Sequence, residues 1–368
     1  MTRAYTASRR LLATLRLAAQ GIAAPSFETP VEVVRHMLAM QAQDFPGAKW
    51  SVGLRTVGAS DADVERAIAD RQIVRSWPMR GTLHFAAAED LGWMLALTRD
   101  RMVKGAAGRH RTLELDDSSF ALAARIAERE LAVSGVIGRS ALLAAFDAAG
   151  LSTAGQRGNH LLWYLSVTGL LVFGPLDGKQ HSFALLSDWV RTARPLTGDE
   201  ALAEFARRYF TSHGPATDRD FAWWSSLTLT DARRGLAAVA GEFEQLDVDG
   251  RTYYHRPGLE PARAGVFALP GFDEYVLGYQ DRSAPLAAEW VDRVVPGGNG
   301  VFFPTIVVDG EIVGTWKRTV SAKQISITTV PLAPLGARAQ AATRTRLQSY
   351  ATFMRLPLRL PPEGLAVE

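Results

Sequence analysis

Residues 61–84 read DADVERAIADRQIVRSWPMRGTLH, and this stretch predicts a helix followed directly by a two-stranded hairpin. The helix is expected at about 61–70, because acidic residues at its start suit the positive end of a helix dipole. The runs IVRSW and TLHF then have the β-branched and aromatic residues that strands prefer, and they flank a turn at Pro78–Gly81.

Two further helices are predicted before this stretch. The first is expected at about 8–19. The second begins with a capping box at Thr29, with Pro30 at the first helical position and Glu32 three residues after the cap, and its apolar face continues to Gln41. Three helices followed by a two-stranded hairpin is the plan of a winged helix-turn-helix domain.

The same order of elements recurs twice downstream. The second copy has helices expected at about 117–133, 139–150 and 156–169, followed by the runs LLVFG and SFALL. The third copy has helices expected at about 198–212, 217–225 and 230–240, followed by FEQLDV and TYYH. The copies share an order of elements and not an obvious residue repeat, which is weaker evidence than a repeat of fixed period.

After about residue 263 the chain changes to short β-rich runs separated by turns, and Asp309–Gly310 between two of them is a strong hairpin signal. With a final amphipathic helix at about 335–355, this region predicts a small β-barrel or curled sheet with a helix packed on it. The expected fold is mainly α with β (α+β). Its predicted domains are three tandem winged helix-turn-helix domains at 1–105, 106–195 and 196–262 and a β-barrel domain at 263–368.

The composition is that of a globular chain. At 368 residues it is too long for one compact core, and 47% hydrophobic residues exclude disordered and fibrous classes. No stretch approaches the roughly 18 consecutive apolar residues of a membrane span, and we expect no signal peptide and a cytoplasmic, nucleoid-associated protein. The absence of cysteine excludes disulfides and zinc-thiolate sites, and seven scattered histidines predict no metal and no cofactor.

The net charge and the arginine content point to different conclusions about the partner of this chain. The formal net charge is only +3, although 36 of the 41 basic residues are arginine. Arginine's planar fork suits phosphate and base edges, but the codon usage of a GC-rich genome explains the same excess. Composition alone therefore does not identify a nucleic-acid-binding protein.

The motif QAQDFPG at residues 41–47 stands out chemically. In a helix, side chains two residues apart point about 200° from each other, so only an extended or irregular segment brings the amides of Gln41 and Gln43 to one side. Pro46 biases the preceding residue out of the helical region, and Gly47 favours a chain reversal. A helix is therefore predicted to end near this motif. On these residues alone, a polar helix end facing solvent is the simpler interpretation.

Basic residues also gather on the predicted first hairpin. Arg75, Arg80 and His84 lie where they could approach a phosphate, and an arginine-decorated hairpin that packs on its own domain is an equal alternative. Near the start of the β region, Asp281 and Arg282 predict either an exposed ion pair or part of a cleft. Asn299 lies in a Gly-rich turn that is either a loop tip or a probe that enters a groove.

Four segments of this chain resemble the bacterial winged-helix DNA glycosylases of the AlkZ type. They read LAMQAQDFPGAKW, SWPMRGTLH, FDEYVLGYQDRS and NGVFFPTIVVDGEIVGTWKR, and the resemblance covers nearly the whole chain. It implies three tandem winged helices and a β-barrel in a C-shaped clamp around double-stranded DNA. It also implies a catalytic pair at Gln41 and Gln43, and a monomer is expected.

The resemblance further implies a substrate. A related branch has aspartate in place of the second glutamine, whereas here Gln43 is followed by Asp44. This favours the branch that excises bulky N7-alkylpurines, or unhooks interstrand crosslinks, in self-resistance to genotoxic natural products. An N7-alkylated guanine leaves as a neutral base, so the remaining tasks are to position water and stabilise a cationic sugar, which oriented amides can do.

Several supporting roles follow. Asp44 is a candidate base or electrostatic support, Lys49 is the candidate nucleophile of an alternative lyase mechanism, and an open cleft is expected beside Gln41. The predicted DNA-binding residues are Arg75, Arg80, His84, Arg157, Arg282 and Asn299. A basic cluster of Arg101, Lys104, Arg109 and Arg111 is expected on the same inner face. The alternative function is a non-catalytic winged-helix transcriptional regulator.

Overall fold

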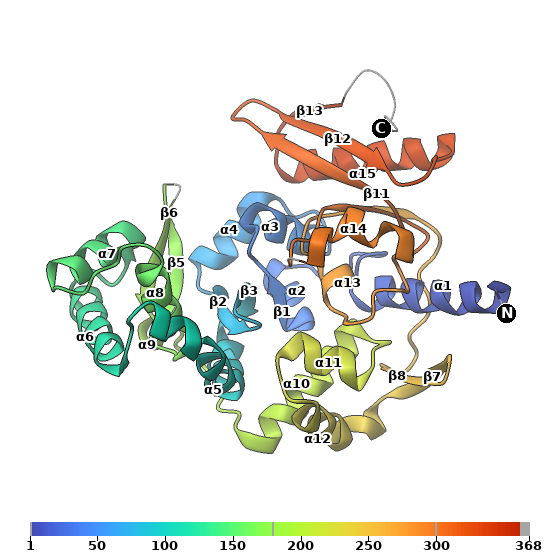
Figure 1. Ribbon diagram of the computed structural model, residues 1–368. Coiled ribbons are helices and arrows are strands. Elements are labelled where there is room, and N and C mark those ends of the chain that lie inside the picture. Colours follow the sequence, from blue (N-terminus) through green and yellow to red (C-terminus); the bar gives the residue numbers. More distant parts are fainter. Residues whose placement is uncertain (1, 179, 299, 361–368) are drawn as a thin grey trace. The chain divides into compact units, whose positions relative to one another are not determined.

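The computed structural model describes residues 2–178, 180–298 and 300–360, and it confirms a mixed α+β fold. The chain forms two compact units. One comprises Met1–Glu65 with Ala203–Glu368, and the other comprises Arg66–Leu202. Figure 1 shows the elements of each unit. The division of the chain into four domains stays a prediction.

The N-terminal elements lead up to the motif. They are α1 (Thr2–Ala19), α2 (Pro30–Met37), β1 (Ala39–Gln41), α3 (Phe45–Gly53) and α4 (Asp61–Ala69). The capping box of α2 is present, since the Thr29 hydroxyl accepts from the Glu32 amide and the Glu32 carboxylate accepts from the Thr29 amide. The predicted start of α2 is therefore confirmed.

Two expectations about the residues around this motif were wrong. The helix does not run on to Gln41, because Leu38 has a φ of 65° and turns the chain out of α2 into β1. The residues after the motif form α3 and not a chain reversal. Pro46 lies in the first turn of α3, where its missing N–H is not needed, so it starts a helix here instead of excluding one.

The unit Arg66–Leu202 contains two hairpins and four longer helices. Its elements are β2 (Ile73–Met79), β3 (Thr82–Ala87), α5 (Ala88–Thr112), α6 (Asp117–Ser134), β4 (Ile137–Gly138), α7 (Arg139–Ala148), α8 (Arg157–Val167), β5 (Leu171–Asp177), β6 (Gln180–Leu185) and α9 (Leu186–Trp189). The hairpins join where Arg75 pairs with Phe173, giving the strand order β3-β2-β5-β6-β4. The predicted helices at 117–133, 139–150 and 156–169 are confirmed to within two residues at each end.

Helix α5 was not predicted. It is 25 residues long, and its buried side chains lie mainly in its first half, so the second half lacks the apolar stripe by which a surface helix is recognised. Its second half carries the predicted basic cluster, and all four of these side chains are exposed: Arg101, Lys104, Arg109 and Arg111.

The third predicted set of elements is confirmed as α10 (Gly198–His213), α11 (Asp218–Ser225), α12 (Leu229–Val239), β7 (Glu244–Val248) and β8 (Arg251–His255). A short 3₁₀ helix, η1 (Ala240–Glu242), joins α12 to the β7–β8 hairpin. Three segments of helix-then-hairpin order are thus present. Their assignment as winged helices stays a prediction.

Among the described residues, the C-terminal region forms an open sheet and not a closed barrel. Its elements are β9 (Val266–Leu269), α13 (Glu274–Leu277), η2 (Ala288–Trp290), α14 (Val291–Val294), η3 (Pro296–Gly298), β10 (Thr305–Val308), β11 (Glu311–Val320), β12 (Ile325–Pro331), α15 (Ala337–Phe353) and β13 (Leu358–Arg359). The strand order β13-β12-β11-β10-β9 leaves β13 and β9 at the edges, so the curled-sheet alternative is correct.

The predicted hairpin at Asp309–Gly310 and the predicted final helix are both confirmed. Helix α15 lies against the sheet (Figure 1). Its Tyr350 packs edge-on against Trp316 of β11, with ring centroids 5.4 Å apart. A neighbouring core joins apolar residues of α1, β9 and α13. Within the described part of the chain, no helix has both the length and the apolarity that crossing a membrane requires.

Candidate active site

The two glutamines of the motif lie on the short connection between α2 and α3. The chain is extended up to Gln41 and bends at Gln43, so the segment is of the non-helical kind that their spacing required. The residues leading into it, Leu38 to Met40, are buried. Gln41 is only 6% exposed, whereas Gln43 is exposed. The motif therefore presents one partly hidden and one accessible carboxamide.

A buried carboxylate binds the backbone of this segment. The Gln41 N–H donates to Glu274 Oε1 at 2.8 Å, and the Trp224 indole N–H donates to Glu274 Oε2 at 2.8 Å. His213 Nε2 lies 3.6 Å from the same Oε2. Glu274 is fully buried at the start of α13. Sequence reasoning quoted its segment but assigned it no role, although an acid among Phe, Tyr, Val and Leu residues was a signal.

The preceding residue anchors α3. Asp273 accepts from Arg55 Nη1 and Nη2 at 2.9 Å each and from the Ser51 hydroxyl at 2.6 Å, and Asp273 and Arg55 have no exposed side-chain surface. Arg55 also donates to the backbone and side-chain oxygens of Gln20. Asp273 in addition accepts from the Tyr275 amide, which caps α13. A buried ion pair so fully hydrogen-bonded fixes α13 against the end of α3.

Asp44 is held from the side of the sheet. Its backbone carbonyl begins α3 by accepting from the Ala48 amide, and its carboxylate oxygens lie 2.9 and 2.7 Å from Nη2 of Arg318 on β11. Gly47 makes this approach possible, because a Cβ at that position would lie 2.4 Å from Asp44 Oδ2. Sequence reasoning did not single out Arg318. The carboxylate predicted to support catalysis is thus bound in an ion pair in this structure.

The side chain of Lys49, the candidate nucleophile of a lyase mechanism, is also held in ion pairs. Its ammonium lies 2.7 Å from Asp61 Oδ2 and 2.7 Å from Glu65 Oε1, and its side chain is 6% exposed. A lysine whose Nζ is bound by two carboxylates is not available to attack a sugar.

The cations of the first hairpin are mostly buried. Arg75 is 5% exposed, and it donates to His181 Nε2 at 2.6 Å and lies 5.1 Å from the centroid of the Phe173 ring. Burial lowers the pKa of Arg75 to about 10, and burial together with the Arg75 charge lowers the pKa of His181 to about 4.

His84 is fully buried, and its Nε2 accepts from Arg80 at 2.8 Å. Arg80 is half-buried in the turn, with a φ of 55°. The alternative of a hairpin that packs on its own unit thus describes Arg75 and His84. Their contact with phosphate stays a prediction that requires the hairpin to rearrange.

Arg157 has a local structural role. It donates to the carbonyls of Leu113, Glu114 and Ser152, and the first two follow the C-terminal end of α5. Helix ends leave such carbonyls without intrahelical partners, so this arginine closes the end of α5. Its predicted contact with DNA therefore competes with a contact that the fold already uses.

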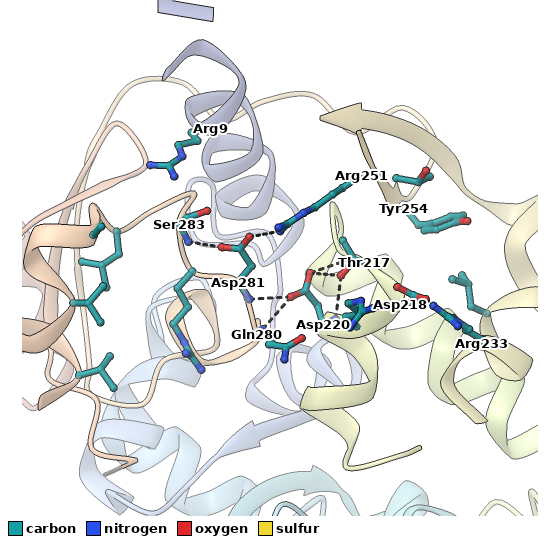
Figure 2. Close-up of a pocket in the computed structure, with 18 of the residues that line it drawn as sticks. Arg9, Thr217, Asp218, Asp220, Arg233, Arg251, Tyr254, Gln280, Asp281 and Ser283 are labelled. Atoms are coloured by element: carbon teal, nitrogen blue, oxygen red, sulfur yellow. Dashed lines mark hydrogen bonds and ion pairs between the residues drawn. The ribbon is translucent and has the colours of Figure 1, made fainter. Parts of the chain in front are cut away.

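Arg282 lines a pocket of about 1420 Å³ formed largely by α11, α12, β8 and residues 280–283 (Figure 2). It donates to the Val276 carbonyl at 3.0 Å and lies 4.9 Å from the ring centroids of both Trp223 and Phe302. Burial lowers the pKa of Arg282. The cleft alternative is therefore correct for Arg282.

Two of the acidic residues that line this pocket form ion pairs. Asp281 forms its ion pair with Arg251 at 2.6 Å, and not with Arg282, and Asp218 pairs with Arg233 at 2.6 Å (Figure 2). Neither glutamine of the motif lines this pocket. Asn299, the proposed probe, lies outside the described residues. Among those residues no group of three or more His, Asp or Glu side chains could hold a metal ion.

Comparisons with known proteins agree with each other. The family model described as DNA glycosylase AlkZ-like matches residues 34–353. A relative from Streptomyces sahachiroi, named interstrand DNA cross-link repair glycosylase, is 25% identical over an alignment of 353 residues that covers 89% of this chain and 92% of the relative. The solved structure of Streptomyces sahachiroi DNA glycosylase AlkZ has a TM-score of 0.78 and 24% identity, covering 96% of this chain and 99% of that one.

Proposed function

This chain belongs to the AlkZ-like DNA glycosylases, enzymes that hydrolyse N-glycosyl bonds, and on this premise we propose that it excises bulky N7-alkylated purines and unhooks interstrand DNA crosslinks. The observation that carries the proposal is the non-helical segment at Gln41 and Gln43, which offers uncharged amides at the family's catalytic position. The name of the Streptomyces sahachiroi relative supports the crosslink substrate. The biological role proposed is self-resistance to a DNA-alkylating natural product.

The chemistry explains why amides suffice. A purine alkylated at N7 carries a positive charge and leaves as a neutral base, so no general acid is needed. What remains is to orient a water molecule and to stabilise the developing positive charge on the sugar. An amide oxygen accepts from that water while an amide N–H donates to a phosphate oxygen. Because Gln43 is the exposed member of the pair, we assign it the contact with the sugar-phosphate, and we assign the water to Gln41.

Asp44 takes a supporting role in this proposal. Its carboxylate is bound by Arg318, so acting as a base would require it to leave that ion pair. Held where it is, it contributes negative charge beside the motif, which favours a cationic sugar. It also ties the start of α3 to β11.

DNA binding is proposed to use the basic cluster of α5 together with the three helix-and-hairpin segments acting as winged helices. The four side chains of the basic cluster are exposed on one helix, where they can contact successive phosphates of a DNA strand. Arg282 and Arg80 are proposed as further contacts. We propose that a single copy of the chain binds duplex DNA.

The test is an excision assay on duplex DNA that carries one N7-alkylguanine. The wild type should produce abasic sites that alkali cleaves, and replacing both Gln41 and Gln43 with alanine should lower the single-turnover rate at least about 100-fold. Borohydride should trap no covalent adduct, because no lysine attacks the sugar. A trapped adduct, or an unchanged rate in the double variant, would contradict the mechanism. Tight binding of one undamaged sequence without excision would favour a transcriptional regulator.

A further inference from the structure

We propose that Glu274 is a positioning residue of this site, which fixes the backbone of Gln41 for excision without touching the DNA. This inference rests on the function proposed above. Glu274 and its neighbour Asp273 begin the four-residue helix α13, and together they hold the chain on both sides of the motif.

Glu274 holds the side before the motif. Its two oxygens accept N–H groups from Gln41 and Trp224, residues 233 and 50 positions away in sequence, at 2.8 Å each. The Glu274 side chain is only 1% exposed, so water competes little for these bonds. Hydrogen bonds to an ionised acceptor are shorter and stronger than those to a neutral one. Glu274 therefore joins three distant segments at one point behind Gln41.

Asp273 holds the side after the motif. Its carboxylate binds Arg55 through two N–H groups and Ser51 through a hydroxyl, and both residues lie at the end of α3 or just beyond it. Since α3 starts directly after Asp44, any shift of α13 moves both ends of the motif together. Adjacent carboxylates on one short helix thus form a clamp around the catalytic segment.

The segment needs such a clamp. It follows Leu38, whose φ of 65° is disfavoured for an L-residue and persists only where its surroundings hold it. An oriented amide is useful only if it is held in place, since a misplacement of about 1 Å can lower a rate by about 100-fold. A merely structural role for Glu274 would instead lower stability without a specific effect on excision.

The test variant is Glu274→Gln, which keeps the shape but replaces one acceptor oxygen with an NH₂ group. One of the two N–H donors then faces another donor. We expect the single-turnover excision rate at saturating enzyme to fall about 10- to 100-fold, while affinity for the lesion DNA changes less than about 2-fold. Hydrogen exchange at the Gln41 amide should accelerate in parallel.

The matched control is Asp220→Asn. Asp220 is likewise a buried carboxylate that accepts distant backbone amides, those of Gln280 at 2.9 Å and Asp281 at 3.2 Å, but it has no described contact with the motif. It should lower thermal stability and leave the excision rate of the folded protein and exchange at Gln41 unchanged.

A rescue variant sharpens the inference. Adding Trp224→Phe to Glu274→Gln removes the competing donor, so the amide oxygen can again accept from Gln41, and the rate should recover at least in part. If Glu274→Gln does not fold, Glu274→Asp keeps the charge but withdraws it from Gln41 and should slow excision in the same way.

Three outcomes would overturn the inference: a normal rate in the glutamine variant, unchanged exchange at Gln41, or the same loss of rate in Asp220→Asn. A wild type that excises no alkylated base would instead refute the proposed function. Exchange at the Gln41 amide would then decide by itself whether Glu274 fixes this segment.

Discussion

The Gln41 segment and the β2–β3 hairpin both keep polar groups in an apolar interior, but they satisfy them by different means. At the Gln41 segment, carboxylates accept from the buried donors: Glu274 accepts from an amide and an indole, and Asp273 accepts from Arg55. At the hairpin, Arg75 donates to a neutral imidazole and lies over an aromatic ring. The hydrogen bonds of the first arrangement are charge-assisted, whereas the second places a buried cation against an uncharged acceptor and an aromatic ring.

The difference has a functional meaning. Carboxylates that bind a backbone fix its position, which suits a site whose uncharged amides must be oriented. An arginine that donates to a neutral imidazole, as Arg75 does, has no charge from that partner to offset its own, so it raises the potential around the hairpin although its side chain is buried. The total charge of a protein is accordingly a poor guide to its partners, since only the charge near the binding face matters.

The largest expected effect concerns the two buried arginines. Arg55→Met leaves the Asp273 carboxylate buried without its counter-charge and should lower the free energy of unfolding by about 3–5 kcal/mol. Arg75→Met removes a hydrogen bond to the neutral His181 and should cost about 1–2 kcal/mol. Urea denaturation of both variants measures the difference. Equal costs would show that the two regions are held by interactions of similar strength.

A smaller effect is expected from two glycines. Gly47→Ala would place a Cβ 2.4 Å from Asp44 Oδ2, so the Asp44–Arg318 ion pair must shift, at a cost of about 1–3 kcal/mol, with slower excision. Gly92→Ala on α5 meets no atom within 4 Å and should instead stabilise the protein by about 0.5–1 kcal/mol. Thermal melting and the excision assay measure both changes. The comparison fails if the two variants shift the melting temperature in the same direction.

The smallest effect is on binding of undamaged DNA. Removing the exposed Arg101 and Lys104 together should weaken binding a few-fold at physiological salt, and it should make the dependence of log affinity on log salt shallower by about 0.9 for each lost phosphate contact. Arg75→Met should leave that slope unchanged, because its side chain is buried. Fluorescence anisotropy over a salt series provides the measurement. A reduced slope for Arg75→Met would show that the hairpin opens to reach phosphate.

Local signals predicted most of the elements. The capping box at Thr29 and the turn at Asp309–Gly310 each depend on residues a few positions apart, and both are present in the structure. The failures have local causes as well. Pro46 was expected to bias Phe45 out of the helical region, although both lie in the first turn of α3, and α5 was not predicted because its second half has no apolar face.

The site was only half visible in the sequence. The spacing of Gln41 and Gln43 required a non-helical segment, and that is what the chain forms. Nothing in the spacing could indicate that Glu274 lies behind Gln41 or that Arg318 binds Asp44, because 233 and 274 residues separate these partners. Likewise, strand alternation allowed Arg75 to face either side of its hairpin, and packing placed it inside.

The sequence by itself thus determined most of the helices and strands, with α3 and α5 as exceptions, together with the α+β class and the family, since these depend on short-range patterns and on motifs in a fixed order. The tertiary structure alone decided which polar groups are buried, which carboxylate binds which donor, and that the C-terminal strands remain an open sheet. The physical reason is that burial and charge pairing depend on contacts between segments far apart in the chain, and no local preference encodes them.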